Sequence, residues 1–240
     1  MNDLRRYIRL LIEQVDRPQV IFMAGGPGSG KSTVIRSLGL AERMEIVNPD
    51  DAYEAALKME GIPMDRQQLL DEYMPIKERY LAAVDANNQA EVEALEPEYT
   101  RLRGLLSRNM KLFTSARKKA AERQQMLADA GTDFLVDGTG GNYRQITNLA
   151  TKLRESGYEV GMIFIDVPME VSVERDRRRG EMGGRRLGRR TVERSWNSVN
   201  RNKEPYQQFF GDSFFYVDAT EENFRQSIVD ISGPVGSFLR

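Results

Sequence analysis

The sequence predicts an α/β fold in which helices flank a parallel sheet of five strands. Five short apolar runs alternate with segments of helical periodicity, and this alternation is typical of βα units. The first run leads through a glycine-rich turn directly into a helical segment. The predicted strands are residues 20–24, 44–47, 134–136, 161–165 and 214–217. Residues 3–15 are expected to form an amphipathic helix ahead of the first strand.

The composition restricts the chemistry available to the chain. Its 240 residues include no cysteine and no histidine, so disulfides, thiolate metal sites and the commonest general base are excluded. A carboxylate or a lysine must carry any proton transfer, and a hard cation such as Mg²⁺ fits best. No apolar run approaches 18 residues, so we expect a protein without a membrane span, in the cytoplasm.

Residues 25–32 read Gly-Gly-Pro-Gly-Ser-Gly-Lys-Ser and fit the pattern G-x-x-x-x-G-K-[ST]. They lie between a predicted strand and a predicted helix, which is the context of a phosphate-binding loop. Glycines allow successive backbone amides to face one anion, with a helix amino terminus behind them. Lys31 is expected to reach the β- and γ-phosphates of ATP, and Ser32 to hold Mg²⁺. The predicted nucleotide-binding residues in this loop are Gly26, Gly28, Ser29, Gly30, Lys31, Ser32 and Thr33.

Acidic residues follow the second and third predicted strands. Asp50 and Asp51 come after the second, where Pro49 ends the strand and either acid could cap a helix from about residue 52. In a parallel sheet the loops after the carboxyl ends of the strands form the ligand crevice. Asp50 is therefore our candidate base for an attacking hydroxyl group. Asp137 ends the third strand in a Walker-B-like pattern and is expected near the metal or the acceptor.

The stretch 65–130 shows helical periodicity and almost no strand signal. A single straight helix of this length would span about 100 Å, so we expect it to fold back as a hairpin. Asn87-Asn88 and Glu96-Pro97 are the predicted bends. The predicted organisation is a core of residues 1–54 and 131–240 with an insertion of residues 55–130. Packing, dimerisation and substrate gripping are all open roles for this insertion.

Residues 175–194 contain nine arginines, three acids and four glycines. An arginine-rich segment punctuated by glycine after a late strand is typical of a closing lid, and we call residues 175–194 the lid. Planar guanidinium groups suit phosphoryl oxygens. The alternative is a solvated basic surface. Arg175 and Arg179 are the predicted catalytic arginines, and Arg179 is also expected to bind the nucleotide. Arg185 is expected to bind the acceptor together with Asp51 and Asp137.

These motifs resemble the kinase branch of the P-loop fold, in particular polynucleotide 5′-kinases and zeta-toxin-type kinases. Residues 25–33 match the loop of both groups, and Asn48-x-Asp50-Asp51 resembles the N-x-D-D of phage polynucleotide kinases. Arg175-x-x-x-Arg179-Gly180 resembles the lid of the same kinases, whereas residues 136–139 and 183–185 are closer to the toxin group, which has Glu at the position of Asp137. The resemblance covers residues 19–54 and 132–220. It implies the strand order 2-3-1-4-5, ATP and Mg²⁺ as cofactors, and a base at Asp50.

Together these features predict a kinase that transfers the γ-phosphate of ATP to a hydroxyl group. The lid carries more positive charge than ATP alone needs, so a nucleotide or nucleic acid is the expected acceptor, possibilities including a hydroxymethylated pyrimidine in phage DNA. One rival is a UDP-sugar kinase of the toxin type. An ATP-hydrolysing switch is another, although the chain lacks a second basic finger far from the lid. A non-enzymatic DNA-binding module would not need Lys31.

Overall fold

A computed structural model describes residues 17–239, and the predicted helix 3–15 lies outside this range. Five parallel strands form one sheet in the order β2-β3-β1-β4-β5, which confirms the predicted fold class and strand order. Each strand end lies within two residues of its predicted position. The strands are β1 (Gln19–Ala24), β2 (Glu45–Val47), β3 (Phe134–Asp137), β4 (Glu159–Asp166) and β5 (Phe214–Asp218).

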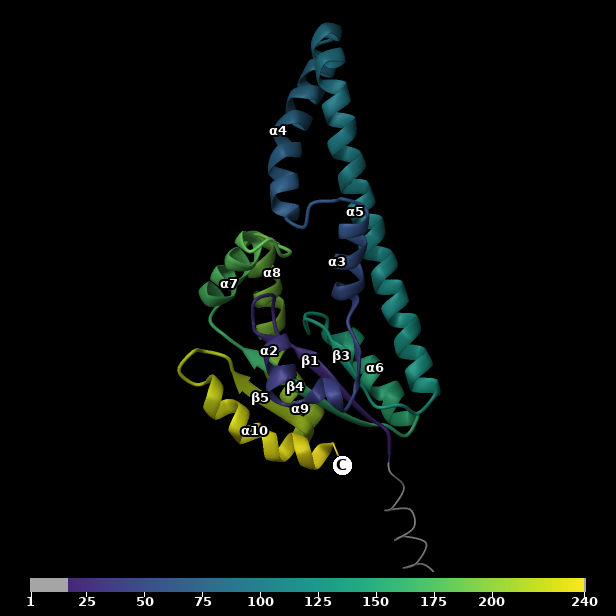
Figure 1. Ribbon diagram of the computed structural model, residues 1–240, viewed down its shortest axis with the longest axis vertical. Coiled ribbons are helices and arrows are strands. Elements are labelled where there is room, and N and C mark those ends of the chain that lie inside the picture. Colours follow the sequence, from purple (N-terminus) through teal and green to yellow (C-terminus); the bar gives the residue numbers. More distant parts are fainter. Residues whose placement is uncertain (1–16, 240) are drawn as a thin grey trace, which may run out of the picture.

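Helices cover both faces of the sheet (Figure 1). Short turns of 3₁₀ helix at Leu40–Glu42 and Gly211–Ser213 precede β2 and β5. The helices of the core are α2 (Lys31–Ser37), α6 (Tyr143–Glu155), α7 (Met169–Glu181), α8 (Arg189–Asn200), α9 (Lys203–Phe210) and α10 (Phe224–Phe238).

The central strand β1 is buried along its whole length, and its side chains alternate between two apolar clusters. Ile21 and Met23 face α2 and α10, whereas Val20 and Phe22 face α5, α6, α8 and α9. Burial on both faces is expected for the middle of a parallel sheet, and it fixes the register of the strand, because a shift by one residue would exchange the two faces. The loop after β1 is therefore held in a fixed position.

Three helices lie between β2 and β3: α3 (Pro49–Met59), α4 (Arg66–Asp85) and α5 (Gln89–Asp129). Helices α4 and α5 form an antiparallel hairpin that projects from the core, and α3 packs against α5 (Figure 1). Stacked tyrosines join the hairpin, with ring centroids of Tyr80 and Tyr99 4.2 Å apart. The bend predicted at Asn87-Asn88 is present, and Asn87 has a φ of 52°.

The bend predicted at Glu96-Pro97 is wrong, because Pro97 lies inside the continuous 41-residue helix α5. A proline removes one backbone hydrogen bond, but the remaining bonds and the packing against α3 and α4 keep this helix in one piece. The helix after β2 also differs from the prediction. It begins at Pro49 rather than near residue 52, and Asn48 caps it, its Oδ1 accepting from the Asp50 amide at 2.8 Å. Asp50 and Asp51 therefore occupy its first turn instead of the cap.

None of the helices within residues 17–239 is long and apolar enough to cross a membrane.

Candidate functional site

The phosphate-binding loop connects β1 to α2 at the carboxyl edge of the sheet. Gly28 and Gly30 have φ values of 77° and 98°, which a residue with a Cβ rarely adopts. A Cβ on Gly28 would also lie 2.4 Å from the carbonyl oxygen of Ser172 on α7. Ser29 is buried, whereas Ser32 and Thr33 are exposed in the first turn of α2. The predicted loop residues are thus arranged around the amino terminus of a helix.

Lys31 folds back over this loop. Its Nζ donates to the carbonyl oxygens of Gly25 at 2.9 Å and Gly26 at 3.4 Å. Burial of the ammonium group lowers the pKa of Lys31, and the negative charges of Asp137 and Asp50 oppose that shift. The positive charges of Arg179 and Arg185 add to it. The structure therefore brings five of the predicted site residues close enough to act on one another electrostatically.

Asn48 connects the carboxylates at the ends of β2 and β3. Its Nδ2 donates to Asp137 Oδ2 at 3.1 Å and to Asp51 Oδ1 at 3.2 Å, while its Oδ1 caps α3. The sequence resemblance contained Asn48 but gave it no role. An asparagine directly before Pro at a helix start is the local signal for this cap.

Asp137 has the properties expected of a metal-facing carboxylate. Burial raises the pKa of Asp137, with Lys31 opposing the shift, and its Oδ1 is buried without a hydrogen-bond partner in the described part of the chain. Within residues 17–239 no three acidic, cysteine or histidine side chains gather into a metal cluster. Ser32 and Asp137, the two predicted metal ligands, both carry oxygen donors. That donor set suits Mg²⁺.

Asp50 forms a two-pronged ion pair with Arg185 from the lid. Arg185 donates to Asp50 Oδ1 at 3.0 Å and to Oδ2 at 2.6 Å, and its Nε lies 3.3 Å from Glu54 Oε1. The side chain of Arg185 is 9% exposed and that of Asp50 44%. Both oxygens of the predicted base are therefore engaged by a buried guanidinium group.

The lid consists of the end of α7, a loop over residues 182–188 and the start of α8. Asp176, which is 2% exposed, organises it. Its carboxylate accepts from Arg179 at 3.0 Å and from the amides of Leu187 and Gly188, each at 3.1 Å. Sequence reasoning counted Asp176 only as one acid among nine arginines. An acid three residues before Arg179 on a helix is the signal that could have identified this pair.

Arg175 from α7 contacts the backbone of the phosphate loop. It donates to the carbonyl oxygens of Gly28 at 3.3 Å and Ser29 at 3.4 Å, and to that of Ala219 after β5 at 3.0 Å. These contacts connect the loop to the sheet edge. Several other lid arginines pair with acids on α7 and α8: Arg177 and Arg178 with Glu174, and Arg189 with Glu170 and Glu193.

The loop after β3 is also fixed from the α8–α9 side. Asn202 donates to the carbonyl oxygens of Gly140 and Gly141, and the hydroxyl groups of Tyr206 and Ser198 donate to the same two carbonyls. Trp196 of α8 lies over Gly26, where an added Cβ would be 3.6 Å from its Cα. The sequence analysis assigned none of Trp196, Ser198, Asn202 and Tyr206 to the site.

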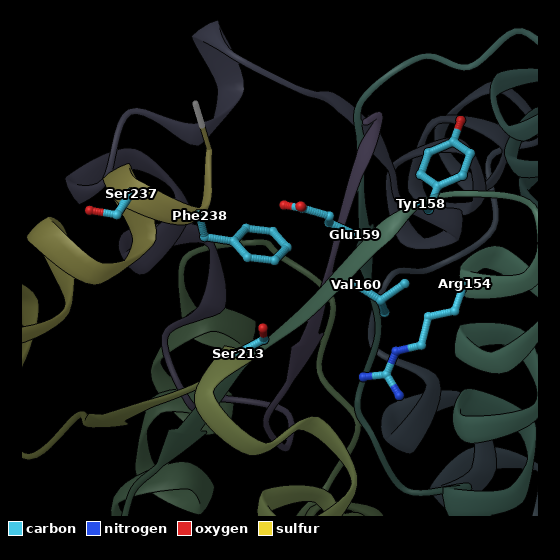
Figure 2. Close-up of a pocket in the computed structure, with 7 residues that line it drawn as sticks. All are labelled: Arg154, Tyr158, Glu159, Val160, Ser213, Ser237 and Phe238. Carbon is cyan, nitrogen blue, oxygen red and sulfur yellow. The ribbon is translucent and has the colours of Figure 1, made fainter. Parts of the chain in front are cut away.

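A separate pocket of about 400 Å³ lies at the amino end of β4. Figure 2 shows Phe238 beside this strand, with Arg154 and Ser213 at other parts of the wall. Because Glu159 pairs with Gln19 at the start of β1, this pocket lies at the edge of the sheet opposite the phosphate loop. It does not belong to the site described above.

Comparison with known proteins identifies the family. Residues 20–202 match the AAA_33 family, which is described as an AAA domain. A search of curated proteins finds no match. A solved structure of a candidate kinase from Chloroflexus aurantiacus has a TM-score of 0.58 at 16% identity, covering 94% of this chain and 100% of that chain.

Two further solved structures have TM-scores below 0.5. A gluconokinase from Sinorhizobium meliloti has a TM-score of 0.46 at 16% identity, covering 93% of this chain and 96% of that chain. A structure of the PezAT toxin–antitoxin system from Streptococcus pneumoniae has a TM-score of 0.48 at 14% identity, covering 100% and 96%. The family match spans most of the sequence and fits the five-stranded sheet and loop described above. This chain belongs to the AAA_33 family and has a P-loop kinase-like fold.

Proposed function

We propose that this protein is a Mg²⁺-dependent kinase that transfers the γ-phosphate of ATP to a hydroxyl group of a nucleotide- or nucleic-acid-type acceptor. The observation that carries the proposal is the arrangement around Lys31. A phosphate-binding loop, two carboxylates and two arginines, Asp50, Asp137, Arg179 and Arg185, share one electrostatic neighbourhood. An ATP-binding scaffold alone would not need a carboxylate beside the expected γ-phosphate position.

The roles of the loop follow from its contacts. The amides of Gly26 and of residues 28–33, together with the Lys31 ammonium, hold the β- and γ-phosphates, and Lys31 exchanges its carbonyl partners for phosphate oxygens. Ser32 and Asp137 hold Mg²⁺, which when bound neutralises charge on the phosphates. Arg175 supports the loop through its backbone carbonyls, and its assignment as a catalytic arginine stays a prediction.

The transfer step requires a base and a cation at the reacting groups. In the proposed reaction, Asp50 accepts the proton of the acceptor's hydroxyl group. The hydroxyl oxygen of the acceptor then bonds to the γ-phosphorus, while the bond from this phosphorus to ADP breaks and ADP leaves. Asp51 is the alternative base, and Asn48 holds it beside Asp137. Arg179 neutralises the transferring group. Arg185 already donates to both oxygens of Asp50, so in the proposed reaction it turns from this carboxylate toward the phosphate oxygens as the substrates bind.

The nature of the acceptor is the finer part of the proposal. Nucleotide-type acceptors fit a site in which Arg185 and the half-exposed Asp50 border the phosphate loop. The pairing of Arg177, Arg178 and Arg189 with nearby acids reduces the lid charge that remains for a long polyanion. A nucleotide or a short 5′-hydroxyl strand is therefore the acceptor class we put first, with a UDP-sugar as the rival.

The decisive experiment is transfer of label from γ-labelled ATP. The acceptor panel contains 5′-hydroxyl DNA and RNA, hydroxymethylpyrimidine DNA, nucleotides and UDP-sugars. We expect label on one class, abolished in Lys31→Met and retained in the control Lys58→Met, an exposed lysine on α3. Asp50→Asn and Asp51→Asn distinguish the two candidate bases. Release of inorganic phosphate without label on any alcohol would favour an ATP-hydrolysing switch instead.

A further inference from the structure

Arg185 is held in place by more than its ion pair. Its guanidinium group lies over the ring of Tyr53 on α3, with 5.6 Å from Cζ to the ring centroid. Its Nε is buried without a hydrogen bond in the described region, although Glu54 lies nearby. A guanidinium group has five N–H donors, so Arg185 retains capacity for another acceptor. The same group therefore pairs with Asp50 and remains able to bind an anion.

Tyr53 is in turn fixed by the insertion. Its hydroxyl donates to Oδ1 of Asn109 on α5 at 2.8 Å, and both residues are nearly fully buried. They lie in the apolar cluster between α3 and α5, where the edge of Phe113 packs against the Tyr53 ring. A phenylalanine and a leucine would satisfy this cluster at lower desolvation cost. A buried hydrogen-bonded pair in such a place indicates that the orientation of the Tyr53 ring matters.

The amide of Asn109 supports the same reading. Its Nδ2 is buried and has no hydrogen-bond partner within residues 17–239. Native proteins leave few such groups, and each has a cost in stability. The sequence retains that cost at a residue of α5 that contacts Tyr53, the residue beneath Arg185.

We propose that Asn109 and Tyr53 are positioning residues that hold Arg185 across Asp50, so that the carboxylate stays paired with Arg185 until phosphate oxygens draw Arg185 away. This inference rests on the proposed function, because it takes Asp50 as the base. Arginine binds phosphate oxygens with the same two-pronged geometry that it uses on a carboxylate, so the exchange needs no new type of contact. While Arg185 donates to both oxygens of Asp50, water must compete with a guanidinium group for this carboxylate, which limits loss of ATP before an acceptor enters.

The lid makes two further contacts with the insertion that fit this arrangement. Arg186 lies 3.6 Å from Asp65, and Gly188 is so close to Gln67 on α4 that an added Cβ would be 2.6 Å from its Oε1. The insertion thus meets the lid at α4 as well as through the Asn109–Tyr53–Arg185 chain. The role left open for the insertion in the sequence analysis becomes control of the lid.

The test uses Tyr53→Phe and Asn109→Leu in the full chain, with Tyr158→Phe as the matched control. Tyr158→Phe also removes a buried hydroxyl group that donates to α5, at the carbonyl oxygen of Leu127. Tyr158 lies far from Arg185 in the fold. Hydrogen exchange is measured on the peptide covering residues 183–190 without ligand. We expect about five- to tenfold faster exchange in Tyr53→Phe and Asn109→Leu, the factor for one buried hydrogen bond, and no change in Tyr158→Phe.

The second measurement is phosphate release from Mg²⁺-ATP without an acceptor. Tyr53→Phe should raise this rate about five- to tenfold while the Kd for ATP, followed by fluorescence of the single tryptophan Trp196, stays within about twofold. In an Asp50→Asn background, the same substitution should have no effect, because the carboxylate that pairs with Arg185 is absent. A general loosening of the fold would act in both backgrounds.

The two measurements separate the two proposals. Unchanged exchange in Tyr53→Phe and Asn109→Leu overturns the positioning role, as does a hydrolysis gain that persists with Asp50→Asn. Faster lid exchange in a protein that neither hydrolyses nor transfers phosphate would support the positioning role and refute the proposed function.

Discussion

Replacing Asp176 with asparagine should loosen the lid and lower the thermal stability of the protein. One carboxylate accepts from Arg179 and from the amides of Leu187 and Gly188, and asparagine has a single oxygen for these donors. At least one buried donor is then left facing the amide NH₂ group. The substitution also removes the negative charge beside Arg179.

The size of the effect follows from burial. Breaking a fully buried ion pair costs about 3–5 kcal/mol. The Arg179 side chain is 38% exposed and can regain water, so we expect about 2–4 kcal/mol for Asp176→Asn. For a chain of this length that corresponds to a fall in Tm of about 5–15 °C. The Leu187–Gly188 turn, which lies directly after Arg185 and Arg186, should become more mobile.

Thermal unfolding followed by circular dichroism gives the stability, and limited trypsin digestion after Arg185 and Arg186 reports the lid. The control is Glu174→Gln, which removes exposed ion pairs with Arg177 and Arg178 on the outer face of α7. No resolvable change in Tm is expected there. An Asp176→Asn protein that melts within about 2 °C of the wild type and resists trypsin equally would refute the assignment of Asp176 as the lid organiser.

Three further substitutions test other parts of the structure. Burial raises the pKa of Asp137 above its ordinary value of 3.8, and Lys31 only partly opposes this shift. The folded state therefore binds more protons than the unfolded state, so the stability of the protein falls as the pH rises above 3.8. In urea titrations, Asp137→Asn should be more stable than the wild type at pH 7, and the difference should vanish below about pH 4. Gly28→Ala should lose ATP binding and about 1–3 kcal/mol of stability, because φ is 77° and its Cβ would meet Ser172. The control Gly104→Ala in α5, where nothing lies within 4 Å, should be neutral or stabilising. A Gly28→Ala protein with wild-type nucleotide affinity would contradict the loop assignment. Pro97→Ala should raise Tm, because a regained backbone hydrogen bond inside α5 is worth about 1–3 kcal/mol, and a lower Tm would show that the proline is needed there.

The sheet and the phosphate loop could be predicted because their signals are local. Alternating apolar runs and helical segments specify βα units, and the glycines at 28 and 30 specify the backbone angles of the loop. The position of Asp137 at the end of β3 follows in the same way, since a strand boundary is set by the residues beside it.

Long-range partners could not be predicted from these patterns. The pairing of Asp50 with Arg185 joins residues 135 positions apart, and the local sequence around Arg185 does not indicate which acid it contacts. The bond between Tyr53 and Asn109 likewise depends on how α3 meets α5. Pro97 misled the prediction for the opposite reason, because a local helix-breaking preference was outweighed by the packing of a long helix.

The length of helix α5 enlarges small movements along the hairpin. Its 41 residues form a rod of about 60 Å, and Asn109 lies at its midpoint, 20 residues from Gln89 and 20 from Asp129. A rotation of about 5° around the end next to β3 would displace the far end by about 5 Å. A small tilt of α5 where it meets the sheet is therefore enlarged at the outer end of the hairpin, where α5 follows α4.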